Sequence, residues 1–505
     1  MSHKIKAQSF LEVSHQFKLG ELATEKQHPK TIGLSDLSKN SLELALSAVK
    51  EIELDLIDTA LFKQKEINQF SLDVQEVLSE GGRVFLCGCG ATGRLSLALE
   101  TIWNKSGAHK GRVLSFMAGG DVALIHSIEN FEDHPDYGER QLSDLGFCES
   151  DLLIAITEGG ETPFVIGAVE AASKVSSKPP YFLYCNTDSI LSSAVERSKK
   201  VLENPGIKKL NLSTGEMVLT GSTRMQASTI LMLVTGQAIF GLNQEWVLKL
   251  KHKLESIDLN ILKKFIVSES DIYKSNGGVV YLTDAALGIS VLTDTTERSP
   301  TFSLIPFEEN DKDTPDVYSL CYLSLVGEEG AKKAWSALLG RKPRSLEWED
   351  TRALTALDRL YRFDISSTSF SKRSSYCSGE QFKFNISLED NRLKLSLMEH
   401  AEVIDFEEYD LLSIHLILKI LLNTHSTLVM GRLGRYESNI MTWVRPSNNK
   451  LIDRTIRYIL ILLKEKGVEK SYEEVCYKLF EEMENAKKDD PLVLKTLESI
   501  LGSIS

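Results

Sequence analysis

The stretch Gly82-Arg-Val-Phe-Leu-Cys-Gly-Cys-Gly-Ala-Thr-Gly-Arg-Leu-Ser96 decides the fold of this chain. Its apolar run over 84–87 predicts a buried strand that leads into a glycine-rich turn, and a helix is predicted over 95–104. A helix that begins directly after such a turn brings unpaired backbone N–H groups together, and these groups bind anions. The stretch therefore predicts a phosphate-binding turn. Its glycine spacing also fits the dinucleotide-binding fingerprint, so a nucleotide cofactor is a second interpretation of the same residues.

Strands and helices alternate in the residues that follow. The predicted strands cover 113–117, 152–156 and 181–184, and the predicted helices cover 163–174 and 189–197. This alternation predicts an α/β fold whose parallel sheet is covered by helices on both faces. Ligands bind at the carboxyl ends of such strands, where the glycine turn, Thr157–Gly160 and Asn186 are expected to lie.

A second copy of this unit is predicted downstream, after one long helical span over 222–268. The strand–turn–helix pattern returns over 278–292, but Ala285 and Ala286 stand in place of the glycine and the hydroxyl. The second copy is therefore expected to have lost its phosphate site, which leaves one site per chain. The expected parts of the chain are a helical N-terminal segment (1–80), a first α/β domain (81–245), a linking helix with a second, degenerate domain (246–432) and a C-terminal helical cap (433–505).

The composition restricts the function. The chain has 505 residues, enough for two or three domains, and a formal charge of −13. An acidic protein attracts neither nucleic acid nor anionic membranes, so neither partner is expected. The apolar stretch 411–429 contains two histidines and Lys419, which predicts a buried helix and no membrane span. The first residues show no apolar signal region, and a cytoplasmic location is expected.

The seven cysteines are scattered without the spacing of a disulfide framework, a redox pair or a metal site. They are expected to be reduced, which fits a cytoplasmic protein. Neither a metal nor a cofactor is predicted.

Three further motifs follow the glycine turn in a fixed order. They are Thr157-Glu-Gly-Gly-Glu-Thr-Pro163, Leu219-Thr-Gly-Ser-Thr-Arg-Met225 and Ser447-Asn-Asn-Lys-Leu451. Together with the turn, they resemble the sugar isomerase (SIS) domain group, which contains N-acetylmuramic acid 6-phosphate etherase and glucokinase regulatory protein. The resemblance is dense over 81–240 and can be followed to about residue 458. It implies two tandem SIS domains with flavodoxin-like parallel sheets and a helical cap, as in the regulatory protein.

The resemblance implies that the glycine turn contacts a sugar phosphate. The residues concerned are Gly90, Ala91, Thr92 and Gly93. Thr92 also fits a helix N-cap, and one hydroxyl can serve both purposes. Arg94 is a further candidate for the phosphate, although an arginine in a first helical turn is more often salt-bridged or solvated.

The second motif places Thr157, Glu158 and Gly159 between a strand and a helix that begins with proline. Backbone N–H groups at that helix N-terminus favour an anion, and the resemblance implies that these three residues bind the ligand phosphate. Etherases usually carry serine, glycine and arginine at positions 159–161. This chain has Gly159-Gly-Glu161 instead, which is closer to the regulatory protein.

Two other segments are expected to close over the phosphate. Ser222 and Thr223 are predicted to cap the long helix, and in the SIS group this segment lies over the ligand, so both are candidate contacts. Arg224 is expected to support the turn. Lys450 matches a cap lysine that reaches the sugar phosphate in the regulatory protein, and electrostatic closure is its expected role.

Two glutamates are candidate acid–base groups. Glu129 matches a glutamate that has acid or base work in etherases and contacts the sugar in the regulatory protein. Glu297 lies in a segment that resembles the one with the second etherase glutamate, whereas the first domain has Ile102 at the matching place. Fusion of two copies would let the second domain lend Glu297 to the site of the first. A local ion pair with Arg298 is the alternative for Glu297.

Two functions fit these residues. The first is a binding protein that resembles glucokinase regulatory protein, in which a hexose or amino-sugar phosphate binds between the domains and alters contact with a partner such as a sugar kinase. The tandem domains, the cap and the pattern of Thr157–Gly159 favour it. The second is an etherase-like lyase that removes a lactyl ether by elimination, with Glu129 and Glu297 as acid and base in either order. The absence of arginine at Glu161 disfavours it.

Other functions are less favoured, and the chain is expected to be a monomer or a homodimer. An aldose–ketose isomerase shares the fold, but no glutamine or histidine base can be placed. A dinucleotide-dependent dehydrogenase is disfavoured because no acidic residue for a ribose follows the turn at a strand end.

Overall fold

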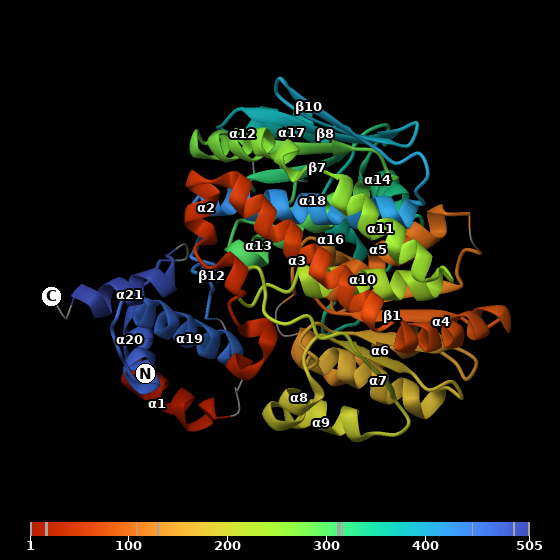
Figure 1. Ribbon diagram of the computed structural model, residues 1–505, viewed down its shortest axis with the longest axis horizontal. Coiled ribbons are helices and arrows are strands. Elements are labelled where there is room, and N and C mark those ends of the chain that lie inside the picture. Colours follow the sequence, from red (N-terminus) through yellow and green to blue (C-terminus); the bar gives the residue numbers. More distant parts are fainter. Residues whose placement is uncertain are drawn as a thin grey trace.

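Two α/β layers enclose a central layer of helices, and a helical bundle lies at one side (Figure 1). This computed structural model describes residues 3–15, 19–107, 109–128, 131–310, 315, 317–446, 448–487 and 490–502.

The strands are β1 Val84–Gly88, β2 Val113–Met117, β3 Leu152–Ile156, β4 Tyr181–Tyr184, β5 Lys208–Asn211, β6 Gly278–Thr283, β7 Cys321–Leu325, β8 Gln381–Glu389, β9 Arg392–Leu397, β10 His400–Asp405, β11 Tyr436–Glu437 and β12 Ile440–Met441. The helices are α1 His3–Ser14, α2 Leu34–Asn40, α3 Leu42–Phe62, α4 Gln64–Ser79, α5 Ala91–Lys105, α6 Pro135–Asp144, α7 Pro163–Val175, α8 Asp188–Ala194, α9 Glu196–Glu203, α10 Gln226–Ile239, α11 Gln244–Ser256, α12 Lys263–Lys274, α13 Gly288–Phe302, α14 Ala331–Leu339, α15 Arg352–Thr355, α16 Leu357–Tyr361, α17 Ser369–Tyr376, α18 Leu411–Arg432, α19 Asn449–Glu465, α20 Tyr472–Glu484 and α21 Leu492–Gly502.

The first sheet has the order β2-β1-β3-β4-β5, and its strands are all parallel. Every residue of β1 and β3 is buried, because α5 packs on β1 and β2 while α7 packs on β3. The predicted parallel α/β fold is therefore confirmed. The strand order reverses between β1 and β3, which places a crevice at the carboxyl ends of these two strands.

The second sheet repeats only part of this arrangement. Its order is β10-β9-β8-β6-β7, in which β6 pairs in parallel with β7 and β8, as β1 does with β2 and β3. Beyond β8, however, β9 and β10 are antiparallel, so this sheet is mixed whereas a parallel sheet was expected. Asp390 and Asn391, with φ of 50° and 57°, form the tight two-residue turn that reverses the chain between β8 and β9.

The central layer holds α18, which is long and apolar enough to cross a membrane but is buried along its whole length. It packs against α2, α12 and α13, and Figure 1 shows it between the two sheets. It is a core helix, as the sequence predicts.

Two helical predictions were wrong in detail. The span 222–268 is not one helix but contains α10, α11 and the start of α12, and the chain turns at Gly241, which has φ of 62°. The predicted helix over 189–197 is divided into α8 and α9 at Val195. The edge strand β5 was not predicted, because its two lysines do not read as a buried strand.

The N-terminal helices do not form one unit. α1 packs against α20, so it belongs to the bundle of α19, α20 and α21 at the side of the molecule (Figure 1). By contrast, α3 and α4 pack against α10 in the body of the protein. The short hairpin of β11 and β12, which was not predicted, leads into the bundle.

Candidate functional site

Three glycines shape the turn between β1 and α5. Gly90 has φ of 55° and ψ of −121°, a backbone conformation that glycine adopts far more readily than other residues. A Cβ atom on Gly88 would lie 2.3 Å from the carbonyl carbon of Thr92, and one on Gly93 would lie 2.5 Å from the Cβ of Met117. The glycines therefore let β1 end directly against the first turn of α5, so that the helix N-terminus faces the crevice.

Thr92 holds this turn together. Its Oγ1 accepts a hydrogen bond from the N–H of Cys89 and donates one to the carbonyl of Cys89, each at 2.9 Å. The residue is only 1% exposed. The predicted N-cap role was wrong, because Gly90 occupies the N-cap position. The hydroxyl stabilises the turn through these two hydrogen bonds. Its contact with phosphate stays a prediction.

A cavity of about 290 Å³ opens beside this turn. It is lined by most of the predicted ligand-binding residues, namely Gly90, Ala91, Glu158, Gly159, Ser222, Thr223, Glu297 and Lys450. Thr92, Gly93 and Thr157 are buried and do not line it. Glu129 lies outside the described residues, although Ser127 and Glu132 before and after it line the cavity.

Segments far apart in the sequence build this cavity. The first domain supplies the β1–α5 turn, the β3–α7 loop and the turn before α10, whereas α13 of the second domain supplies Glu297, Pro300 and Thr301. The N-terminal segment contributes Glu25, and the helix α19 contributes Lys450. The expectation that Glu297 is lent to a site of the first domain agrees with this geometry.

The β3–α7 loop presents a carboxyl group to the cavity. The hydroxyl of Thr157 accepts a hydrogen bond from the N–H of Gly160 at 3.2 Å, which fixes the loop. The next residue, Glu158, accepts a hydrogen bond from the hydroxyl of Ser228 at 3.0 Å. Burial raises the pKa of Glu158 to about 7, and the nearby carboxylate of Glu297 acts in the same direction. Glu158 can therefore exchange a proton near neutral pH.

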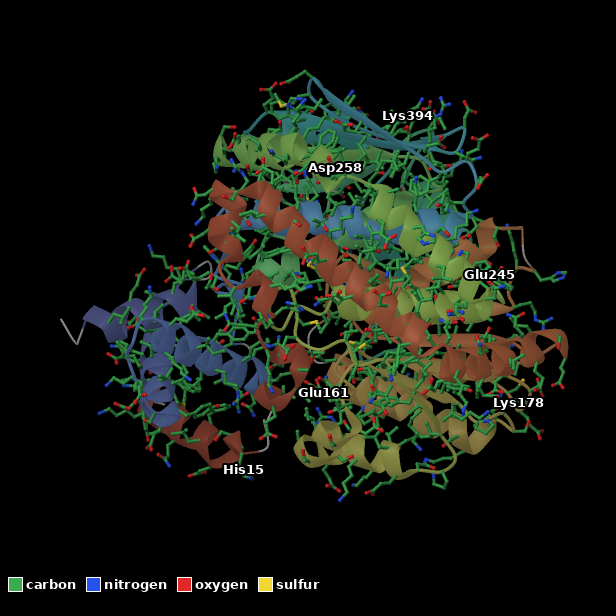
Figure 2. All side chains as sticks on the ribbon, viewed as in Figure 1. His15, Glu161, Lys178, Glu245, Asp258 and Lys394 are labelled. Carbon is green, nitrogen blue, oxygen red and sulfur yellow. The ribbon has the colours of Figure 1, made fainter. Side chains whose placement is uncertain are left out.

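Glu161 connects this loop to α19 of the helical bundle. Its carboxylate lies 2.6 Å from Nζ of Lys450 and also pairs with Arg197. Although burial opposes ionisation, these two cations lower the pKa of Glu161 to about 2. Glu161, labelled in Figure 2, lies where the first domain meets the N-terminal segment and the bundle. The amine of Lys450 thus reaches the cavity wall through an ion pair that the sequence did not predict.

The turn before α10 differs from the expected helix cap. Met225 holds the N-cap position of α10, so Ser222 and Thr223 do not cap the helix but line the cavity one turn earlier. Arg224 supports this turn from inside: its guanidinium donates to the hydroxyls of Ser426 and Thr427 at 3.0 and 2.7 Å. This supporting role is the one that the sequence predicts for Arg224.

Glu297 is a buried carboxyl on α13. It is 4% exposed, and burial raises its pKa although the cations of Arg94, Arg224 and Lys419 oppose the rise. The alternative of a local pair with Arg298 does not hold, because the guanidinium of Arg298 binds Asp294 at 2.7 Å and Glu269 at 2.6 Å. Glu297 is therefore free to face the cavity.

Arg94 and Arg454 complete the charged lining. The guanidinium of Arg94 donates to the carbonyls of Ala123 and Leu124 at 3.2 Å, so its charge is held in the wall. Arg454 lies 2.5 Å from Glu25, and this pair joins the bundle to the N-terminal segment. Sequence reasoning missed Glu25, Glu132 and Arg454. Only Arg454 gave a signal, as it lies one helical turn after Lys450.

The cavity combines anion-binding and proton-transfer groups. In the described part of the chain its charged lining consists of Arg94, Arg224, Lys450 and Arg454 with Glu25, Glu132, Glu158, Glu161 and Glu297. A helix N-terminus, hydroxyls and cations suit a phosphate, and carboxyl groups suit sugar hydroxyls or acid–base chemistry. Among the residues that the structure describes, no three His, Cys, Asp or Glu side chains are grouped as a metal site requires.

The corresponding turn of the second domain is filled by a lysine. The amine of Lys105, at the end of α5, donates hydrogen bonds to the carbonyls of Ala285 and Leu338. Burial lowers the pKa of Lys105 to about 8. A first-domain side chain thus occupies the place where a second phosphate turn would have opened, beside Ala285 and Ala286.

Comparison with known proteins identifies relatives of the region around the cavity. Residues 66–173 match the family model of the glucokinase regulatory protein N-terminal SIS domain. N-acetylmuramic acid 6-phosphate etherase of Bacillus cereus is 31% identical over 221 residues, which are 43% of this chain and 69% of that protein. The etherase of Photobacterium profundum is 30% identical over 219 residues, 43% of this chain and 66% of that protein. The chain thus spans about two thirds of the length of these relatives.

Solved structures of phosphosugar isomerases are more distant. Tagatose-6-phosphate ketose/aldose isomerase from Escherichia coli is 11% identical with a TM-score of 0.40, covering 79% of this chain and 95% of that one. Phosphoheptose isomerase from Neisseria gonorrhoeae is 16% identical with a TM-score of 0.26, covering 37% and 94%. At these scores the likeness supports no statement about the site. From the family model and the etherase relatives it follows that the chain belongs to the SIS group of sugar-phosphate-binding proteins, which includes N-acetylmuramic acid 6-phosphate etherase and glucokinase regulatory protein.

Proposed function

We propose that this protein is a lyase of the N-acetylmuramic acid 6-phosphate etherase type, which binds a phosphorylated amino sugar in the cavity and removes its lactyl ether. The observation that carries the proposal is Glu297, a buried carboxyl that reaches the first domain's cavity from the second domain. The relatives named as etherases, at 30 and 31% identity, support the same reaction.

In this proposal the phosphate binds at the N-terminus of α5, where Gly90 and Ala91 line the cavity, and beside the hydroxyls of Ser222 and Thr223. Etherases usually carry an arginine where this chain has Glu161. The pairing of Glu161 with Lys450 and Arg197 supports the proposal in spite of that difference, because two cations remain at this place.

The elimination needs two proton transfers. A base removes a proton from the carbon next to the one that bears the ether oxygen, and an acid protonates that oxygen as its bond to carbon breaks. The raised pKa of Glu297 suits a group that holds or releases a proton in this step. The resemblance gives Glu129 the other role. The proposal includes a cytoplasmic location and a monomer or homodimer.

A second candidate is a sugar-phosphate-dependent regulator of a partner such as a sugar kinase. The match of residues 66–173 to the regulatory protein domain favours it. So do the ion pairs Lys450–Glu161 and Arg454–Glu25, through which a bound phosphate would change how the bundle sits on the first domain. In this case the cavity binds a hexose phosphate without reaction.

Incubation with N-acetylmuramic acid 6-phosphate and measurement of released lactate tests the proposal. We expect lactate release by the wild-type protein, and its loss in Glu297→Gln. Glu149→Gln, an exposed glutamate outside the cavity, is the matched control and should retain the activity.

The two candidates predict opposite results. Absence of lactate, together with a rise in melting temperature when fructose 6-phosphate or glucosamine 6-phosphate is added, would refute the lyase and favour the regulator. Lactate release that survives in Glu297→Gln would refute the role of Glu297.

A further inference from the structure

A second cavity, of about 380 Å³, lies where the second domain contacts the first. In the described part of the chain, no residue lines both this cavity and the sugar-phosphate cavity. The first domain supplies β2, the turn after it and the C-terminal half of α6. The second domain supplies the segment 344–348, which follows α14. The cavity is large enough for a small ligand, which would contact both domains.

Two contacts fix the second-domain segment across this cavity. At one end, the guanidinium of Arg344 donates to the carboxylate of Glu100 on α5 at 2.7 Å. At the other end, the indole N–H of Trp348 donates to the carboxylate of Asp144 on α6 at 2.7 Å. Because both ends of the segment are held by the first domain, the cavity is formed before a ligand enters it.

One polar side chain of the cavity lacks a partner in the fold. Gln141, on α6, is 5% exposed, and its Oε1 is buried without a hydrogen bond among the described residues. A half-turn of the carboxamide exchanges its oxygen and its amine, so the group can either accept from a ligand or donate to it. A buried polar atom without a partner lowers stability. Its place beside a cavity therefore indicates a ligand that supplies the missing hydrogen bond.

The charges of the lining disfavour a phosphate or any other anion. Arg344 lines the cavity but already pairs with Glu100. The carboxylates of Asp121 and Glu347 pair with arginines. Asp144, by contrast, pairs with no cation among the residues that the structure describes. An unpaired carboxylate repels an anion, so the lining suits a ligand without negative charge.

The arrangement of polar and apolar groups suits a carboxamide on a ring. Gln141 and Asp144 lie three residues apart on α6, so their side chains are neighbours on one face of the helix. The carbonyl of a ligand amide can accept from Gln141, and its N–H₂ group can donate to the carboxylate of Asp144. The apolar side chains of Phe116, Leu145 and Leu346 also line the cavity and can pack against the ring.

We propose that this cavity is a second ligand site, which binds a small, uncharged aromatic or heteroaromatic carboxamide. Gln141 and Asp144 hold the amide, and the apolar side of the cavity holds the ring. The proposal does not depend on the lyase or the regulator function, because the two cavities share no residue in the described part of the chain.

Benzamide is the probe, and its binding to the full chain is measured by ligand-observed NMR. For a ligand of this size we expect a Kd of about 1 mM. Benzoate has nearly the same shape but a negative charge, and it should bind at least about tenfold more weakly. Addition of glucosamine 6-phosphate should not displace benzamide, since the sugar phosphate is expected in the other cavity.

Gln141→Leu tests the amide contact. It should weaken benzamide binding by about fivefold or more, because the ligand loses one hydrogen bond. The melting temperature should not fall, since the substitution removes an unpartnered buried oxygen. Gln244→Leu, at an exposed glutamine at the start of α11, is the matched control and should keep the wild-type Kd.

Asp144→Asn tests the exclusion of anions and does not depend on the first variant. Asparagine keeps an oxygen that can accept from the indole of Trp348 but carries no charge. The Kd for benzoate should therefore fall to within about threefold of that for benzamide.

Three results would overturn the proposal. The first is no binding of benzamide at about 10 mM, which would leave the cavity to water. The second is displacement of benzamide by glucosamine 6-phosphate, which would place the probe in the sugar-phosphate cavity. The third is an unchanged Kd for benzamide in Gln141→Leu. If Gln141→Leu does not fold, the benzoate measurement on Asp144→Asn decides, and a Kd equal to that of the wild-type protein refutes the site.

Discussion

Replacement of Glu158 by glutamine should stabilise the protein, and only at neutral and alkaline pH. The pKa of this carboxyl is raised from 4.5 to about 7 by burial, so the folded protein binds the proton more tightly than the unfolded chain. This tighter proton binding stabilises the folded protein fully below pH 4.5, and the stabilisation is lost as the pH rises through 7. Glutamine has the same shape and does not ionise, so the variant avoids this loss.

The pKa change sets the size of the effect. A carboxyl whose pKa rises from 4.5 to about 7 on folding lowers the free energy of unfolding by about 3 kcal/mol once it is ionised. The hydrogen bond from Ser228 can be kept by the amide oxygen of glutamine. We therefore expect Glu158→Gln to match the wild-type protein at pH 4.5 and to exceed it by up to about 3 kcal/mol at pH 8.

Urea denaturation at pH 4.5, 6, 7 and 8 measures this difference. Glu161→Gln, on the same loop, is the control with the opposite sign: its pKa is lowered to about 2, so its ionised form stabilises the fold at neutral pH and its removal should destabilise it. A stability difference between Glu158→Gln and wild type that does not change between pH 4.5 and 8 would refute the reasoning. So would the same sign of effect in both variants.

Three further substitutions test the site and the contact between the domains. Gly90→Ala forces alanine to φ of 55° and ψ of −121°, so we expect a loss of about 1–3 kcal/mol in unfolding free energy and no rise in melting temperature with a sugar phosphate. Lys450→Met removes one of the two cations that pair with Glu161, so the cavity wall loses a positive charge that would attract the phosphate. We therefore expect the Kd for fructose 6-phosphate to increase about tenfold in calorimetry. Arg341 pairs with the buried carboxylates of Glu100 and Asp121 at 3.0 and 2.6 Å. Arg341→Met removes these two pairs and leaves the carboxylates buried, so we expect about 3 kcal/mol of destabilisation in urea denaturation.

Each of these variants has a matched control. The controls are Gly107→Ala, which like Gly90 has positive φ and no atom within 4 Å of the new Cβ but does not line the cavity, Lys466→Met at the exposed end of α19, and Arg352→Met, whose side chain is 69% exposed. Gly107→Ala should retain ligand binding, and Lys466→Met should retain the wild-type Kd. Arg352→Met should stay within about 0.5 kcal/mol of wild-type stability. Equal effects on ligand binding for the glycine and lysine pairs, or equal effects on stability for the arginine pair, would contradict the prediction concerned.

The sequence predicted the first sheet well because its strands are apolar runs bounded by clear turns. The strands predicted over 113–117, 152–156 and 181–184 occur with these bounds. It did not predict β5, which is an edge strand rich in lysine, or the hairpins of β8, β9 and β10, whose alternating charged residues resemble a surface loop. The Asp390-Asn391 turn was the available signal for that hairpin.

The site was predicted in part, and the limits are physical. Gly90 and Glu158 line one cavity because motifs that follow strands in a parallel sheet meet at its carboxyl edge. Glu297 and Lys450 reach the same cavity from α13 and α19, and only the resemblance predicted them there. The pairing of Lys450 with Glu161 could not be predicted, since it joins a helix to a loop 289 residues away in the sequence. The pKa of a carboxyl group also depends on its burial and on neighbouring charges, and both are known only from the folded structure.

The lysine at the end of α5 has a consequence for stoichiometry. Because Lys105 fills the turn beside Ala285, the two halves of this duplicated chain are no longer interchangeable. Calorimetric titration should then saturate near one equivalent of sugar phosphate per polypeptide, with a hyperbolic isotherm for the isolated chain. The amine of Lys105 instead joins the two halves through its hydrogen bonds to the carbonyls of Ala285 and Leu338, and these bonds do not depend on the ligand concentration.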